Sequence, residues 1–412
     1  MSGLVRIAIR DIGRNRRRSA ATLVAMLLGV GMLVVAAGYM EGTYSGMIED
    51  NVRVQTSHLQ VRVEGHERSE GSLKWEDLLD DADERAARVR ALPEVRDATP
   101  ILWASGVIGI DEQSVSVAVN GMDFASEVNS PFSDNIVAGE LPAANDREGV
   151  LMGRRLAASL GIGVDDTFSL LAPTSGEWPD EAVFTVRGLY DSGVPGYDAT
   201  TILMPMAKAQ SFTRTDGRAS AIMVLLHNKD RADAAAEAVT SALAPGTYTV
   251  ETWTELNSFM VETTELGRQI VYLLYLIVLG IVAVVIVNTL LMTVFERTRE
   301  MGILASFGMK AREIRRMFLI EAGVLAVAGI VLGVAGGSAV VEYLNRVGIH
   351  LGDVAEVASS SQFSMGEVIY PMHSVRDVVV VSVMALVITL LGSLYPAWYA
   401  SRLEPIEALR AL

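Results

Sequence analysis

The sequence predicts a membrane α-helical protein with four transmembrane helices and a large α+β domain inserted between the first two helices. Three observations favour this fold class. Half of the 412 residues are hydrophobic, which is high for a water-soluble protein of this length. Four apolar runs are long enough to cross a hydrocarbon core of about 30 Å. The segment 41–268 contains no such run, and its acidic residues outnumber its basic ones.

The chain begins with an arginine-rich segment, residues 1–19, and continues with an uncharged run, residues 20–40. Basic residues beside an apolar run favour the cytoplasmic side, so residues 20–40 are expected to form the first transmembrane helix, with residues 1–19 in the cytoplasm. A cleaved signal peptide is the alternative, because small residues near Ala36 and Ala37 would suit cleavage. The apolar run exceeds the roughly 7–15 residues usual in signal peptides, and more spans follow, which favours the transmembrane helix.

Residues 41–268 are expected to fold as a periplasmic α+β domain. The apolar patterns predict strands at residues 52–63, 101–110, 114–121, 219–226 and 248–251, and helices at 75–92 and 230–243, with Asp230 as an N-cap. This order, β-α-β-β, an insertion, and β-α-β, fits a βαββαβ sandwich interrupted by a subdomain at about residues 122–215. Within the insertion, residues 184–190 resemble a strand and 191–198 a loop rich in Gly and Pro.

Three further transmembrane helices are expected, at residues 270–295, 317–341 and 378–400. Basic residues gather in the segment 296–316, which places it in the cytoplasm, whereas the net acidic loop 342–377 is expected outside. The tail, residues 401–412, is then cytoplasmic. Four spans place both termini on the cytoplasmic side.

The cytoplasmic segment is expected to contain a short helix through residues 299–307. The helical spacing places Met301, Leu304 and Ala305 on one face, with the charged residues off that face. A short helix held between two spans, with a small apolar face toward the cytosol, is suited to receive force from a soluble partner. The alternative is a connecting loop whose Met and Leu side chains lie against the lipid headgroups.

The third span carries two further features. Gly329, Gly333 and Gly337 are four residues apart, so another helix backbone could approach closely along this ladder. Glu321 lies one turn inside the same span. Because it is near the cytoplasmic end, we expect it to snorkel to the surface or to pair with Arg315 or Arg316.

The sequence provides no catalytic, cofactor-binding or metal-binding motif. It lacks the G-x-x-x-x-G-K-[ST] loop, which excludes ATP hydrolysis by that route. Its five His are scattered without ligand spacing, and it has no Cys. The net charge of −15 disfavours nucleic acid as a partner, and the sparse intramembrane charge argues against an ion-coupled transporter.

Three stretches carry a family resemblance: RDIGRNRRRS at residues 10–19, REMGILASFG at 299–308, and YPA at 395–397 followed by LEPIEALR at 403–410. They resemble the FtsX-like (MacB/Lol-type) permease family of ABC transporters, although the small residue before the glycine falls one place earlier than in the family pattern. The resemblance implies a separate cytosolic ATPase, which binds the ATP and Mg, and a second permease, either identical or a paralogue. It also implies spans that transmit movement without forming a channel.

The resemblance further implies that the cytoplasmic helix is a coupling helix that contacts the ATPase. Its candidate contact residues are Glu300, Met301, Gly302, Leu304, Ala305, Phe307 and Gly308.

Residues 56–61, 184–198 and 204–210 look most like those of the lipoprotein-releasing permeases. That resemblance implies release of lipid-anchored proteins from the inner membrane to a periplasmic chaperone. An acyl chain would need an apolar groove, for which Met side chains are adaptable. The candidate groove residues are Met40, Met47, Leu256, Phe259, Met260 and Leu266. MacB-like efflux of peptides or small molecules, and regulation of a periplasmic enzyme without transport, remain as alternatives.

Overall fold

The structure is a computed structural model that describes residues 16–65, 72–110, 113–176, 178–243, 248–307, 309–351 and 368–402. The chain divides into two compact units. A helical unit comprises Met1–Tyr44, Thr263–Ile349 and Ile369–Leu412, and an α+β unit comprises Ser45–Glu262 and His350–Val368.

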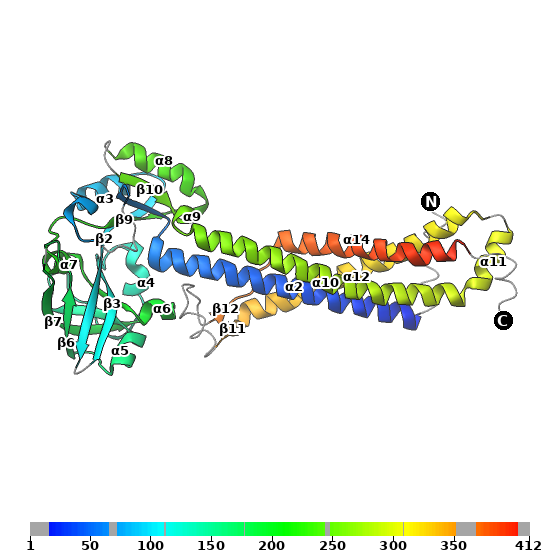
Figure 1. Cartoon of the computed structure of the whole chain (residues 1–412), viewed down its shortest axis with the longest axis horizontal. Helices are drawn as coiled ribbons and strands as arrows, with labels where there is room; N and C mark the ends of the chain where they lie inside the picture. Colours follow the sequence, from blue (N-terminus) through cyan, green and yellow to red (C-terminus); the bar gives the residue numbers. More distant parts are fainter. Residues whose placement is uncertain are drawn as a thin grey trace. The chain divides into compact units, whose positions relative to one another are not determined.

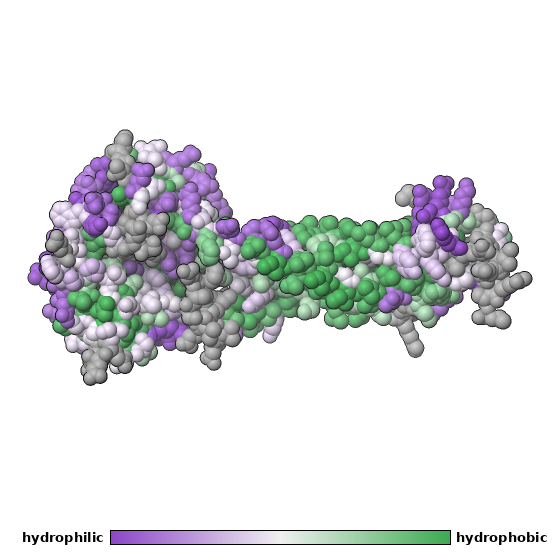
Figure 2. Space-filling model, viewed as in Figure 1, coloured by the Kyte–Doolittle hydropathy of each residue, from purple (hydrophilic) through white to green (hydrophobic). Residues whose placement is uncertain are grey.

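Four long helices dominate the helical unit (Figure 1). They are α2 (Arg16–Asn51), α10 (Ser258–Glu296), α12 (Ala311–Val347) and α14 (Val375–Ala400). Each is long and apolar enough to cross a membrane. Figure 2 shows a continuous hydrophobic surface along them, as expected for side chains that face lipid. The helices extend beyond the predicted spans. The polar and charged residues that flank each apolar run continue the helical backbone hydrogen bonds outside the apolar core.

The glycine ladder of α12 lies directly against α2. A methyl group built on Gly329 would lie 2.6 Å from Cβ of Met26, and one on Gly333 would lie 2.8 Å from Cβ of Val30. One on Gly337 would lie 2.7 Å from the carbonyl oxygen of Gly31. These positions have no room for a side chain, so the two backbones approach each other closely.

The first lobe of the α+β unit is a four-stranded antiparallel sheet in the order β10-β1-β9-β2. Its elements are β1 (Leu59–Val63), α3 (Ala82–Arg90), β2 (Val95–Ile110), β9 (Ala221–Leu226), α8 (Ala232–Ala242) and β10 (Tyr248–Thr252). Apolar side chains from all six elements form one core. The lobe is therefore a βαββαβ unit whose third strand is β9.

The four strands of the first lobe belong to a larger, ten-stranded sheet. The second lobe contains the remaining strands of that sheet and several short helices (Figure 1). Its elements are β3 (Gln113–Met122), α4 (Ser130–Ser133), β4 (Ile136–Gly139), β5 (Gly149–Gly153), α5 (Arg154–Leu160), β6 (Thr167–Ala172), β7 (Asp180–Tyr190), α6 (Pro195–Asp198), β8 (Thr201–Pro205) and α7 (Met206–Thr213). Strand β3 pairs with β2 and with β8, not with any first-lobe strand other than β2.

The predicted start of the insertion is therefore wrong. Strand β2 pairs with β9 from Val95 to Ile101 and with β3 from Leu102 to Ile110, so the second lobe begins in the middle of β2 and not at Met122. The sequence pattern identifies both strands, but it does not reveal that one strand changes partners along its length.

Three local predictions also differ from the structure. The alternating segment 52–63 is a strand only in β1; Val52–Thr56 is a π-helix that ends at Ser57, whose φ is 53°. The predicted helix 75–92 is a 3-10 turn, Trp75–Asp77, followed by α3. Asp230 does not cap α8, because it lies within the preceding 3-10 turn, which Asn228 caps.

Five short elements complete the described chain. They are a 3-10 turn at Glu127–Asn129, α9 (Trp253–Leu256), α11 (Thr298–Ser306), β11 (Ile349–His350) and β12 (Val368–Ile369), and the last two pair with each other. Part of the predicted loop 342–377 and most of the tail lie outside the described residues.

Candidate functional site

Helix α11 connects α10 and α12, and its inner side packs against the ends of the long helices. Met301 is only 3% exposed and belongs to a core cluster with Val294, Ile314, Phe318 and Ala397. The prediction of a cytosol-facing Met301 is therefore wrong. The helical spacing defines a face correctly but does not say whether that face meets solvent or the rest of the chain.

The outer side of α11 carries a different set of residues. Arg299 and Ile303 of α11 and Phe307, which directly follows it, are exposed at four-residue spacing, and the Phe307 N–H donates to the Ile303 carbonyl oxygen at 3.1 Å, so the three lie on one helical stripe. Ile303 is 42% exposed and Phe307 is 87% exposed. The sequence interpretation included Phe307 and missed Ile303, which lies on the opposite side from Met301.

The remaining predicted coupling residues are placed as follows. Glu300 lies at the edge of this stripe and pairs with Arg297, whose Nε is 3.0 Å from its carboxylate. Gly302 is buried. Leu304 and Ala305 belong to α11, but their side chains, and Gly308 altogether, lie outside the described residues.

One hydrogen bond joins the start of α11 to α10, and another caps the start of α12. The Thr298 hydroxyl donates to the carbonyl oxygen of Val294 at 3.0 Å, which joins the start of α11 to the end of α10. At the other end, the Lys310 N–H donates to Glu313 at 2.8 Å in the first turn of α12. A force applied to the outer stripe would therefore reach α10 through a short connection.

The structure does not place the predicted groove residues together in one unit. Met40 and Leu266 belong to the helical unit, whereas Met47, Leu256, Phe259 and Met260 belong to the α+β unit. Phe259 is 65% exposed and Leu266 is 58% exposed, but Met260 is buried at 7%. Met260 therefore does not offer an open apolar surface.

Glu321 is buried in the helical unit, at 7% exposure, so the prediction that it snorkels is wrong. It lines a pocket of about 20 Å³ together with Thr22 of α2 and Thr289 and Thr293 of α10. That volume is enough for about one water molecule. The side chain faces neighbouring helices because it lies on the packed side of α12, along with Phe318 and Leu325.

In the α+β unit, the loop 191–198 is built around a buried carboxyl group. Asp198 is 1% exposed and accepts hydrogen bonds from the Ser192 hydroxyl at 2.7 Å and the Ser192 N–H at 3.1 Å. Burial raises the pKa of Asp198 to about 7, and the nearby Asp191 adds to this effect. Asp191 itself pairs with Arg154 at 2.6 Å.

This shift predicts a pH dependence of stability. The folded state holds the Asp198 proton more tightly than the unfolded state, whose pKa is near 3.8. The stabilisation is present below that value and is lost as pH rises toward about 7. We expect the unfolding temperature to fall between pH 5 and 8, and Asp198→Asn, which mimics the protonated form, to reduce that fall. An equal fall in wild type and variant would contradict this assignment.

Sequence comparisons agree with the architecture. A model described as MacB-like periplasmic core domain matches residues 19–242, which is more than half of the chain. A second model, FtsX-like permease C-terminal, matches residues 272–405. The chain belongs to the FtsX-like permease family. Family membership makes the chain an ABC transporter permease with four membrane-spanning helices and a periplasmic-type α+β domain between the first and second.

Relatives within the family fall into two groups. The chain is 24% identical to the lipoprotein-releasing system transmembrane protein LolC of Xylella fastidiosa, with 98% of each chain covered. It is 26% identical to the macrolide export ATP-binding/permease protein MacB of Nitrobacter winogradskyi, covering 98% of this chain and 59% of the relative. The periplasmic region of MacB from Actinobacillus actinomycetemcomitans is similar at 12% identity and a TM-score of 0.36, over 52% of this chain and 97% of that one.

Proposed function

We propose that this permease transmits ATP-driven movement from a separate cytosolic ATPase, which binds ATP and Mg, to its α+β unit, and thereby releases lipoproteins from the inner membrane. The observation that carries the proposal is the similarity to LolC, which extends over 98% of both chains. In the MacB relative, by contrast, 41% of the length has no counterpart here, since 59% is covered. The MacB relative is named for both ATP binding and permease activity, which agrees with its greater length.

The exposed stripe of α11 supports the coupling part of the proposal. Ile303 and Phe307 are large apolar side chains outside the lipid-facing helices, next to the charged Arg299. Exposed aromatic and aliphatic anchors beside charged groups are typical of protein interfaces. In the proposed orientation, α11 and both termini lie in the cytoplasm, and the α+β unit lies in the periplasm. A second permease and a periplasmic lipoprotein chaperone would complete the system.

The exposed faces of the long helices support contact with lipid-anchored cargo. On α2, Val24, Leu28 and Met32 form an apolar stripe with exposures of 53%, 62% and 71%. Lipid surrounding the helices explains such a stripe on its own, and an acyl chain would find the same surface favourable. The cargo therefore has to be identified directly.

The test is purification of the complete complex from its own cells, with mass spectrometry of bound proteins before and after addition of ATP and Mg. We expect lipid-modified proteins to co-purify and to dissociate on ATP hydrolysis, but not with a non-hydrolysable ATP analogue. Recovery of peptides or small molecules would indicate MacB-like efflux instead. Recovery of an unlipidated periplasmic enzyme that stays bound throughout turnover would indicate regulation without transport.

A further inference from the structure

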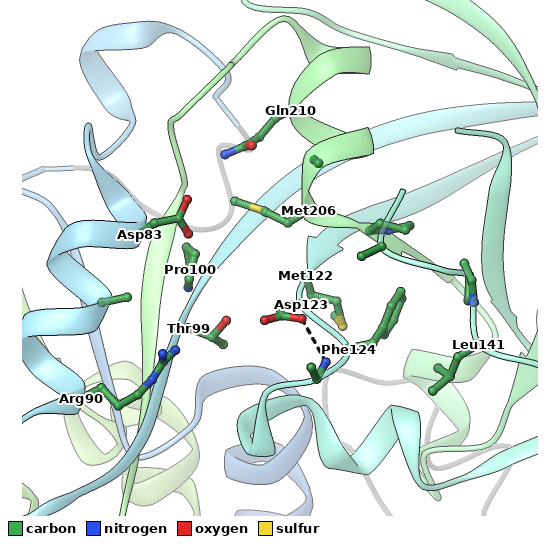
Figure 3. A pocket seen from close by; sticks show the side chains of 16 residues that line it. Asp83, Arg90, Thr99, Pro100, Met122, Asp123, Phe124, Leu141, Met206 and Gln210 are labelled. Carbon is green, nitrogen blue, oxygen red and sulfur yellow. Dashed lines mark hydrogen bonds between the residues drawn. The ribbon is translucent and has the colours of Figure 1, made fainter. Parts of the chain in front are cut away.

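A cleft lies where the two lobes of the α+β unit meet (Figure 3). The first lobe contributes α3 and the middle of β2, and the second contributes the end of β3 and the start of α7. Its volume is about 680 Å³. Small-molecule sites commonly span about 300–1,000 Å³, so the cleft has the size of a ligand site.

The floor of the cleft contains a buried hydroxyl group. Thr99 of β2 lines the cleft and is 1% exposed. Among the described residues, its Oγ1 has no hydrogen-bond partner. The next residue, Pro100, also lines the cleft and has no N–H to offer. Since buried polar groups are nearly always paired, this hydroxyl can pair with a water molecule or with a ligand in the cleft.

Two carboxylates reach the cleft from opposite lobes. Figure 3 shows Asp83 on α3 and Asp123 after β3 on either side of Thr99 and Pro100. One oxygen of Asp123 accepts the Ala125 N–H at 3.0 Å, and the other oxygen carries no such contact among the described residues. Both side chains are exposed, so they can meet a ligand without a large desolvation cost.

Arg90 also lines the cleft, but its charge is already compensated. Its Nε lies 2.8 Å from Asp97, and its Nη2 donates to the Ala98 carbonyl oxygen at 2.5 Å. With the Arg90–Asp97 pair neutral, Asp83 and Asp123 leave the cleft negatively charged. An anionic ligand is therefore disfavoured, and a cation is favoured.

The rest of the lining is apolar and adaptable. Met206 of α7 faces the cleft, and Phe124 and Leu141 also line it (Figure 3), whereas Met122 of β3 is only 1% exposed and lies behind this lining. Met side chains are unbranched and fit ligands of varied shape. The cleft thus combines an apolar wall, a hydroxyl group at the floor and two carboxylates at the sides.

We propose that this cleft binds a protonated amine attached to an apolar body. The ammonium group lies between Asp83 and Asp123, and a hydrogen-bonding atom of the ligand meets the Thr99 hydroxyl. The apolar body packs on Met206 and Leu141. A lysine side chain in an extended polypeptide and a free amphiphilic amine share this chemistry.

The test is calorimetric titration of the full chain in detergent with acetyl-Leu-Lys-Leu-amide, corrected for heats measured in detergent alone. The matched neutral probe is the same peptide with an acetylated lysine side chain. We expect the charged peptide to bind and the neutral one to bind about tenfold more weakly, because charge-assisted hydrogen bonds are lost. Asp83→Asn and Asp123→Asn should each weaken binding of the charged peptide by a similar factor.

Asp233→Asn is the matched control, since Asp233 occupies the first turn of α8 as Asp83 does in α3 but lies outside the cleft. It should leave binding unchanged. Thr99→Val should weaken binding while raising the unfolding temperature, because it removes an unpaired buried hydroxyl. Hexylamine binding equal to that of the peptide would identify a free amine as the ligand, and binding of the peptide alone would identify a polypeptide side chain. Equal binding of charged and neutral peptides, or no effect of both Asp substitutions, would overturn the proposal.

Discussion

Replacing Gly337 by leucine is expected to disrupt the packing of α2 on α12. A Cβ at this position would lie 2.7 Å from the Gly31 carbonyl oxygen and 2.8 Å from Cβ of Val34. The carbonyl oxygen belongs to the backbone of a long helix, so it cannot move aside as a side chain would. Overpacking of a core typically costs about 1–3 kcal/mol, and contact with the backbone places this variant at about 3 kcal/mol or more.

Gly336 provides the control for this prediction. It is the neighbouring residue on the same helix, and a Cβ built there meets no atom within 4 Å. Thermal unfolding of the full chain in detergent should show a large loss of stability for Gly337→Leu and little change for Gly336→Leu. Equal unfolding temperatures for the two variants would mean that α2 and α12 are not in close contact in the protein.

Placing a charge on the outer stripe of α11 is expected to weaken binding of the proposed ATPase partner. Phe307→Asp would introduce a carboxylate where the proposed interface has a large apolar anchor. Loss of such an anchor commonly costs about 2 kcal/mol or more of binding energy. Co-purification of the ATPase and ATP-dependent cargo release should therefore fall together, while the unfolding temperature of the variant stays near that of the wild type, because Phe307 is 87% exposed.

Met301→Ala is the matched control on the opposite side of the same helix. Truncating a buried Met commonly costs about 2–5 kcal/mol of stability, because it leaves a cavity. We therefore expect a lower unfolding temperature with ATPase binding retained by the folded protein. Full ATPase binding by Phe307→Asp would place the ATPase elsewhere and make α11 a simple connector.

The long helices and their packing are features that sequence alone identifies well. An uncharged run of sufficient length has few alternatives to a span, and small residues four apart mark a close contact. Gly333 is an example, because a Cβ there would lie 2.8 Å from Cβ of Val30. The partner helix could not be predicted, since nothing local in the α12 sequence distinguishes α2 from α10 or α14.

The errors arise where a residue's surroundings come from distant parts of the chain. Met301 lies on an apolar face, but the face is covered by Ile314 and Ala397, which the local pattern does not include. Glu321 is buried for the same reason. The cleft in the α+β unit joins Asp83, Thr99 and Asp123 only after β2 has connected the two lobes.

The continuous course of β2 through both lobes limits how the α+β unit can move. Two lobes joined by a flexible loop could rotate freely relative to each other about that loop. Here the pivot is a hydrogen-bonded strand of 16 residues, so the lobes can change their angle only if the strand bends or its pairing shifts near Ile101 and Leu102. The width of the cleft is therefore tied to the curvature of one strand.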